Sequence, residues 1–164
     1  MGYTHYWEQY RSFDDREWSE ITKYAKRICM SKEGKAILGI EQKQSDRLLI
    51  DDLEIIFNGK AKFDQDCETF LLSKNKPKQP DWNKDAIAKG YTFQFCKTNR
   101  KPYDKFVTAI LIIANNIAPG AIVVKSDGDD GDWQDGLDMG HQYMIGLKRP
   151  KDIALRAEAR LNAN

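Results

Sequence analysis

The sequence predicts an α+β fold: a single domain over residues 1–164, with a mixed or largely antiparallel sheet, helices mainly on one face and one β-α-β crossover. Two observations support this prediction. Apolar residues recur at helical spacing in two long segments, 12–34 and 102–118, and short runs rich in aromatic and β-branched residues lie outside them. The strand-like runs follow one another in the middle of the chain, which favours hairpins over regular strand–helix alternation.

The N-terminal half predicts a strand, a helix and then further strands. Residues 4–10 alternate aromatic and polar side chains, as a strand does. The first helix has an apolar stripe at spacings of three, four and three: Trp18, Ile21, Ala25 and Ile28. Ser12 or Asp14 caps its start and Gly34 follows its end. Residues 36–40 predict a short strand, with a polar loop behind them.

The middle and C-terminal segments complete the order. Residues 53–57 and 67–73 predict partner strands, with Asn58-Gly59 as a turn. The lysine-rich stretch 74–90 predicts a long surface loop with one helical turn. A strand is predicted at 91–98, followed by a helix from Pro102 to about 118 and a strand at 121–126. A turn at 127–132 then leads to a helix at 133–147. A last helix, within 148–164, is expected to pack loosely.

The composition is that of an ordinary globular protein. Basic residues number 26 and acidic residues 25, so the charge balance disfavours a nucleic-acid partner, and electrostatic recognition must be local. No apolar run approaches the roughly 20 residues of a membrane span, and no secretory pattern occurs, so no membrane partner is expected. Three cysteines without a CxxC pair fit reduced thiols in the cytoplasm; neither a cofactor nor a metal is expected.

The junction Phe95–Asp104, "FCKTNRKPYD", concentrates cations between a predicted strand and a predicted helix. Helix N-termini present free N–H groups and a partial positive charge, so anions bind there readily. Arg100 offers a bidentate fork to a phosphate. The other candidate ligand-binding groups of the junction are Lys97, Thr98, Lys101, Tyr103 and Asp104. The competing interpretation is a helix capped by Asp104, with solvated lysines around it.

The acidic loop Lys125–Trp133, "KSDGDDGDW", is the second candidate region. Such oxygen-rich loops sometimes bind Ca²⁺ or Mg²⁺, but this one lacks the terminal glutamate of a calcium loop, and a turn in which Asp132 caps the next helix is favoured. If the flanking strands are parallel, a right-handed crossover brings Ser126 and Asp127 to the same sheet edge as the basic junction.

Further candidates lie outside these two regions. His5 and Trp7 share one face of the first strand, where an aromatic ring can stack on a nucleobase and the imidazole can bind phosphate. We expect this strand to contact the basic junction. Asn58 and Glu68 flank the predicted hairpin, and Glu68 is a candidate acceptor for a ribose hydroxyl. The alternative for His5 is a packed or hydrogen-bonded side chain, and the alternatives for Asn58 and Glu68 are turn chemistry and surface charge. A Cys96–His5 nucleophile pair is also conceivable.

Three groups of motifs carry a resemblance: "GYTHYW" at 2–7, "FNG" with "ETF" at 57–59 and 68–70, and "FCKTNRKPYD" with "SDG" and "DW" at 95–104, 126–128 and 132–133. Together they resemble a family of small uncharacterised bacteriophage and prophage proteins. The resemblance implies a small phage-type protein in the host-cell cytoplasm, and names no reaction.

Three functions follow as hypotheses. The first is a non-catalytic binder of a small, anionic, nucleotide-like ligand, which in a phage-type protein suggests sequestration of a host immune signal, an anti-defence sponge. The second is a hydrolase or transferase acting on a phosphorylated substrate, with His5, Glu68, Asp104 or Asp127 as acid/base groups. The third is a protein-binding accessory factor, and four tryptophans leave room for an aromatic interface or a homo-oligomer.

Overall fold

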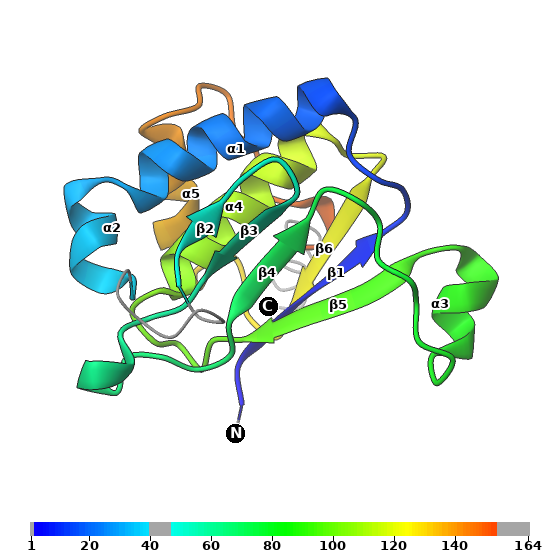
Figure 1. Ribbon diagram of the computed structural model, residues 1–164, viewed down its shortest axis with the longest axis horizontal. Coiled ribbons are helices and arrows are strands. Elements are labelled where there is room, and N and C mark those ends of the chain that lie inside the picture. Colours follow the sequence, from blue (N-terminus) through cyan, green and yellow to red (C-terminus); the bar gives the residue numbers. More distant parts are fainter. Residues whose placement is uncertain (1, 40–46, 154–164) are drawn as a thin grey trace, which may run out of the picture.

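The computed structural model describes residues 2–39 and 47–153, and its elements form the α+β arrangement that the sequence predicts (Figure 1). Two three-stranded antiparallel sheets lie beside a layer of helices. A single buried cluster extends from Trp7 to Ile153 and includes residues of both sheets and of the long helices. The loop expected behind residue 40, and most of the helix expected at 148–164, lie outside the described residues.

The first sheet has a strand from the start of the chain at its centre. Its members are β1 (Thr4–Gln9), β5 (Thr92–Lys97) and β6 (Ile122–Ser126), in the order β5-β1-β6. β1 is antiparallel to both neighbours: Thr4 lies opposite Lys97, and His5 opposite Ser126. β5 and β6 are therefore parallel to each other, as the crossover requires, but β1 lies between them. Their C-terminal ends meet at one edge.

The second sheet contains the predicted partner strands and one that the sequence did not indicate. Its strands are β2 (Leu49–Ile50), β3 (Glu54–Phe57) and β4 (Phe70–Ser73). The strand predicted at 36–40 was wrong over the residues that the structure describes, 36–39: residues 36 and 37 belong to α2 (Lys32–Ile37), and of the four only Leu38 forms a bridge, to Gly59. The reason is local, because Ser31 caps this helix by accepting a hydrogen bond from Gly34 N–H at 3.0 Å.

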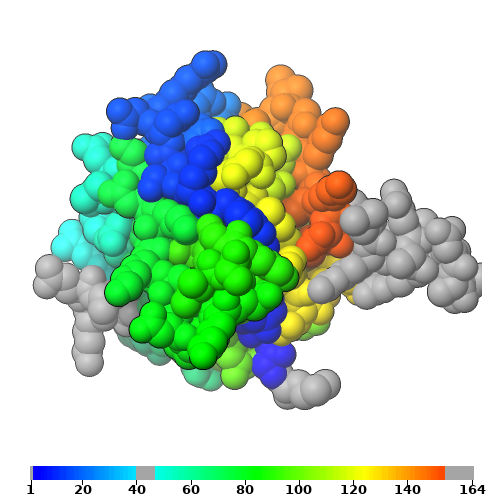
Figure 2. Space-filling view, turned by 90° about the vertical axis from the view of Figure 1, so that its right-hand side faces the viewer, coloured from blue at the N-terminus to red at the C-terminus, as the bar shows by residue number. Residues whose placement is uncertain are grey.

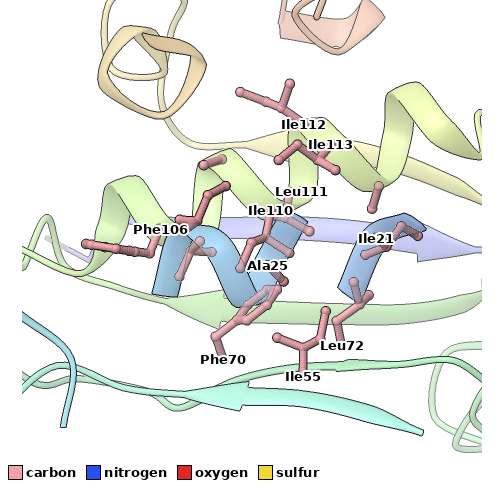
Figure 3. Packing of buried hydrophobic residues seen from close by; sticks show 14 of the residues in the cluster. Ile21, Ala25, Ile55, Phe70, Leu72, Phe106, Ile110, Leu111, Ile112 and Ile113 are labelled. Atoms are coloured by element: carbon pink, nitrogen blue, oxygen red, sulfur yellow. The ribbon is translucent and has the colours of Figure 1, made fainter. Parts of the chain in front are cut away.

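Two long helices build the core. α1 (Asp15–Cys29) buries the predicted stripe, and α4 (Asp104–Ile117) is buried on all sides from Phe106 to Ala114. Figure 3 shows Ile55, Phe70 and Leu72 of the second sheet facing residues of these two helices. α5 (Gln134–His141) packs against α4 and is shorter than the helix predicted at 133–147.

The lysine-rich loop leads into α3 (Lys84–Lys89), which stands out to one side of the first sheet (Figure 1). Figure 2 looks at the molecule from that side, where the loop and α3 project toward the viewer. A 3₁₀ turn, η1 (Ala61–Phe63), lies in the connection between β3 and β4. Throughout residues 2–39 and 47–153, every helix falls short of the length and hydropathy needed to cross a membrane.

Candidate functional site

The basic junction folds as a tight turn between β5 and α4. Lys101 N–H donates to Thr98 O at 3.0 Å, and the two central residues, Asn99 and Arg100, have φ angles of 52° and 57°. Positive φ at both central positions is the pattern of a type I′ turn, which normally uses glycine or asparagine. A left-handed arginine costs roughly 1–2 kcal/mol, so the surroundings must hold it in place.

Tyr3, the residue directly before β1, supplies that support, which agrees with the expected contact between the first strand and the basic junction. Tyr3 O accepts hydrogen bonds from Thr98 N–H and Asn99 N–H, each at 3.1 Å. The Arg100 guanidinium lies over the Tyr3 ring, 3.9 Å from its centroid. A planar guanidinium stacked on an aromatic face gains cation–π energy and keeps its N–H edges free for other partners.

A cavity of about 370 Å³ opens at this turn. Its lining comes from the starts of two helices: Arg100, Lys101, Pro102, Asp104 and Lys105 on the α4 side, and Gly131, Asp132 and Asp135 on the α5 side. Neither helix has a side-chain cap, since Tyr103 and Trp133 occupy the N-cap positions without such a hydrogen bond. The expected caps by Asp104 and Asp132 are therefore absent from these two helices.

The three cations of the cavity each contact an acidic residue. Arg100 pairs with Asp132, and Lys105 pairs with Glu33. Lys101 donates to Asp64 O at 2.7 Å and lies 3.6 Å from its carboxylate. The Arg100 side chain is 58% exposed, and exposed ion pairs contribute only about 0–1 kcal/mol. An anionic ligand can therefore compete with these carboxylates for the cations.

Behind the cavity lies a buried chain of polar side chains. His5 Nδ1 is 2.8 Å from Ser126 Oγ, and its Nε2 is 2.7 Å from Asp104 Oδ1. Thr98 Oγ1 donates to the same Asp104 oxygen, and Gly128 N–H donates to Ser126 Oγ at 2.9 Å. If the imidazole of His5 carries its proton on Nε2, every hydrogen bond of this chain has one donor and one acceptor. The Ser126 hydroxyl then donates to Nδ1, and Nε2–H donates to the Asp104 carboxylate.

Two aromatic rings enclose His5. The rings of Tyr3 and Trp133 each lie edge-to-face with the imidazole at 5.0 Å, and His5 is fully buried. Burial raises the pKa of the Tyr3 hydroxyl well above its usual value of 10.0, with smaller contributions from Asp104 and Asp132, so this ring stays neutral. Of the residues in the polar chain and the two rings around His5, only Asp104 lines the cavity.

The carboxylates of the acidic loop have protein partners. Asp127 accepts from Thr4 N–H at 3.0 Å and from the Tyr6 hydroxyl, on the side of the sheet away from His5. Asp129 and Asp132 each accept a hydrogen bond from the other's N–H. Within the described part of the chain, no group of three or more His, Cys, Asp or Glu side chains is arranged to hold a metal ion.

Several predicted site residues lie away from the cavity. Trp7 is in the core against Phe70, with ring centroids 5.6 Å apart. Asn58 is buried and holds the β3–β4 connection through Gly59 N–H at 2.7 Å and the Cys67 carbonyl at 2.9 Å, so Asn58-Gly59 is no two-residue hairpin turn. Trp7 therefore has a packing role, and Asn58 stabilises the β3–β4 connection by hydrogen bonds.

Glu68, Lys97, Tyr103 and Cys96 gather on the far side of the turn. Glu68 Oε2 accepts from Lys97 N–H at 2.7 Å, and the buried Tyr103 hydroxyl donates to Glu68 O at 2.6 Å. Burial is the main cause that raises the pKa of the Cys96 thiol well above its usual value. The thiol is therefore protonated at neutral pH, which disfavours the nucleophile hypothesis.

Sequence reasoning did not single out Tyr3, Lys105, Trp133 or Asp135 as members of the site. Lys105 had a usable signal, since it follows Lys101 by four residues, the spacing of one helical turn, at the start of the predicted helix. Trp133 is the last residue of the acidic loop, but nothing in the neighbouring sequence indicates that its ring reaches His5. Its Nε1 is buried without a hydrogen-bond partner among the described residues.

Comparison with family models, with curated proteins and with solved structures gives no match for this chain.

Proposed function

We propose that this protein binds a small anionic, nucleotide-like ligand in the cavity at the starts of α4 and α5. The observation that carries the proposal is the position of Arg100. Its guanidinium is stacked on Tyr3 at the edge of a cavity of about 370 Å³, from a backbone conformation that arginine rarely adopts.

The cavity favours a phosphate group for two physical reasons. The starts of two helices without side-chain caps line the cavity and contribute the positive ends of their dipoles. Arg100 provides a bidentate fork, and Lys101 and Lys105 add two point charges.

The rest of the ligand is inferred from Asp104. Its Oδ1 takes the hydrogen bonds from His5 and Thr98, whereas its Oδ2 accepts none from the residues that the structure describes. A carboxylate oxygen held in this way suits a ribose hydroxyl or an exocyclic amine of a base. A volume of about 370 Å³ lies within the range of roughly 300–1,000 Å³ typical of small-molecule sites.

Binding without turnover is the simpler form of this function. Ser126 and His5 are buried, which leaves Asp104 as the one member of the polar chain beside the ligand. Together with the resemblance to phage proteins, this leads us to propose that the protein sequesters a host nucleotide signal in the host cytoplasm. The alternative is a hydrolase or transferase with Asp104 as general base, which the orientation of its carboxylate by His5 favours.

The test is calorimetric titration of AMP, ADP, ATP, cyclic di-AMP and cyclic di-GMP, with the variants Arg100→Gly and Asn99→Gly. Both replace a residue at positive φ by glycine, which accepts that conformation, but only the first removes the guanidinium. We expect Arg100→Gly to weaken binding about 10- to 100-fold and Asn99→Gly to retain it, since hydrogen bonds to charged groups contribute about 1.5–3 kcal/mol.

Chromatography of the ligand after incubation separates the two forms of the proposal. Intact nucleotide recovered from a tight complex supports sequestration, and conversion of the nucleotide supports the enzyme. Binding of no member of the panel, or equal loss in both glycine variants, would overturn the proposal of a site at Arg100.

A further inference from the structure

The outer face of the first sheet carries a connected row of aromatic rings. β1 and β5 alternate, so that His5 and Trp7 point into the core while Tyr6, Phe93 and Phe95 point away from it. The Tyr6 and Phe93 rings stack at 5.8 Å, and Phe93 lies 6.1 Å from Phe95. The Trp82 ring, from the loop before α3, meets Phe93 edge-on at 6.4 Å. We call these four residues the outer aromatic patch: Tyr6, Trp82, Phe93 and Phe95.

Two rings of this patch are open to solvent. Phe95 is 51% exposed and Trp82 is 67% exposed. Large aromatic side chains left exposed together, instead of scattered singly, commonly mark a binding surface. The patch is separate from the cavity at Arg100, since none of its residues lines that cavity.

Residues 74–97 contain three of the four patch residues and are more basic than the chain as a whole. Residues 74–97 contain six lysines and two aspartates, against 26 basic and 25 acidic residues in the whole sequence. Lys74 and Lys89 are engaged in ion pairs with Asp15 and Asp85. The remaining four lysines are Lys76, Lys78, Lys84 and Lys97.

The loop is fastened to the edge of the sheet, so Trp82 is held beside the strand that carries Phe93 and Phe95. Gln79 Oε1 accepts from Phe93 N–H at 2.6 Å, and Thr92 Oγ1 donates to Pro77 O. Lys76 Nζ donates to Gly90 O at 2.9 Å, which connects the loop to the end of α3. A surface assembled before binding loses less conformational entropy when its ligand arrives.

We propose that the outer aromatic patch binds single-stranded nucleic acid. Bases stack on the open rings of Trp82 and Phe95, and lysines of the same segment, residues 74–97, contact the phosphates. Stacking is available only to unpaired bases, because a duplex keeps its base faces covered. Protein–protein interfaces are depleted of lysine at their centres, so the local excess of lysine favours a polyanion over a protein partner.

Trp82 offers a direct probe of this binding. All four tryptophans of the chain lie in the described residues; Trp7, Trp18 and Trp133 are at most 3% exposed, and Trp82 is the exposed one. A base stacked on Trp82 quenches its fluorescence. We expect a twelve-nucleotide oligo-dT or oligo-rU to quench the emission of the full-length protein at low salt, and a twelve-base-pair duplex to have little effect.

Substitutions then locate the site by fluorescence anisotropy of the labelled oligonucleotides. Trp82→Ala and Phe95→Ala should each weaken binding by between about 5-fold and 150-fold. The matched control is Phe63→Ala, which removes an aromatic ring of similar exposure, 58%, from η1. Arg100→Gly should leave oligonucleotide binding unchanged, which separates this surface from the nucleotide cavity.

The affinity should also fall steeply with salt, because lysine contacts release counterions from the phosphates. Conservative replacement by Trp82→Phe should retain binding and abolish the quenching signal. The proposal is overturned if neither oligonucleotide binds at low salt, if the duplex binds as well as the single strands, or if Phe63→Ala weakens binding as much as Phe95→Ala.

Discussion

The helices of this protein begin in two different ways. α1, α2 and α3 start at polar residues whose side chains accept a backbone N–H: Asp14, Ser31 and Asn83. α4 and α5 start instead at Tyr103 and Trp133, two fully buried aromatic residues that form no such bond. The starts of α1, α2 and α3 are stabilised by a hydrogen bond from a capping side chain, whereas the starts of α4 and α5 are held in place by a ring packed in the core.

The difference explains why the cavity lies where it does. A side-chain cap satisfies N–H groups of the first helical turn and occupies the space in front of it. Where a buried ring takes the cap position, the helix start is fixed by packing, and backbone carbonyls take the place of the side-chain cap: Asp104 N–H donates to Lys101 O, and Gln134 N–H donates to Gly131 O. The two uncapped starts are the ones that line the cavity.

The largest effect expected from this comparison concerns Trp133 and Asp14. Trp133→Ala should lower the free energy of unfolding by about 3–5 kcal/mol, because it removes a fully buried ring beside His5. Asp14→Ala should cost only about 1 kcal/mol, the typical value of an N-cap. Urea denaturation of both variants measures the difference. Equal costs would mean that α5 does not depend on its buried start.

A second pair of variants compares two acidic residues of the cavity. Asp104→Ala should cost about 1–3 kcal/mol, because it leaves the buried His5 Nε2 without its partner. Asp135→Ala, in the first turn of α5, should cost about 0.5 kcal/mol, since Asp135 is exposed and acts mainly on the helix dipole. Thermal unfolding monitored by circular dichroism distinguishes them. A harmless Asp104→Ala would show that the polar chain does not stabilise the fold.

The smallest effect concerns the pH dependence of the capped helix α1. The Arg11 guanidinium, with a smaller contribution from Asp14 N–H, holds the pKa of the Glu17 carboxyl below its usual value of 4.5. The folded state therefore binds this proton more weakly than the unfolded state. The stabilisation is complete above about pH 4.5 and is lost as the pH falls through the lowered pKa.

The check is the difference in unfolding free energy between the wild-type protein and Glu17→Gln. It should be a few tenths of a kcal/mol at pH 7, as for other surface pairs, and should shrink toward pH 3. A difference that grows on acidification would contradict the assignment. α4 and α5 have no capping side chain that could titrate. We therefore expect this pH dependence of stability at the start of α1 and not at the starts of α4 and α5.

Local patterns predicted much of the fold because they reflect local physics. The stripe of α1, the β3–β4 partners and the crossover through α4 follow from periodicity and turn residues. The strand expected at 36–40 failed because the capping signal at Ser31, just upstream, set a helix instead. A cap that precedes a short apolar run outweighs the tendency of that run to form a strand.

The site was predicted only in part, because its assembly is not local. The sequence indicated that the basic junction and Ser126 lie at the same end of a crossover, and that His5 and Trp7 share one face of the first strand. It gave no sign that β1 lies between β5 and β6, which is what joins His5 to both Ser126 and Asp104. Which face of β5 is open, and so whether Phe93 and Phe95 are exposed, depends on that same pairing.

The central position of β1 also affects the order of folding. His5 and Ser126 are 121 residues apart, and Thr4 pairs with Lys97. At about 5–20 residues per second, translation of that interval takes on the order of ten seconds. Until β5 emerges from the ribosome both edges of β1 are unpaired, and one edge stays unpaired until β6 emerges, a state that invites misassociation. Neither the polar chain of His5 nor the cavity that it supports can form on the nascent chain until β6 has emerged.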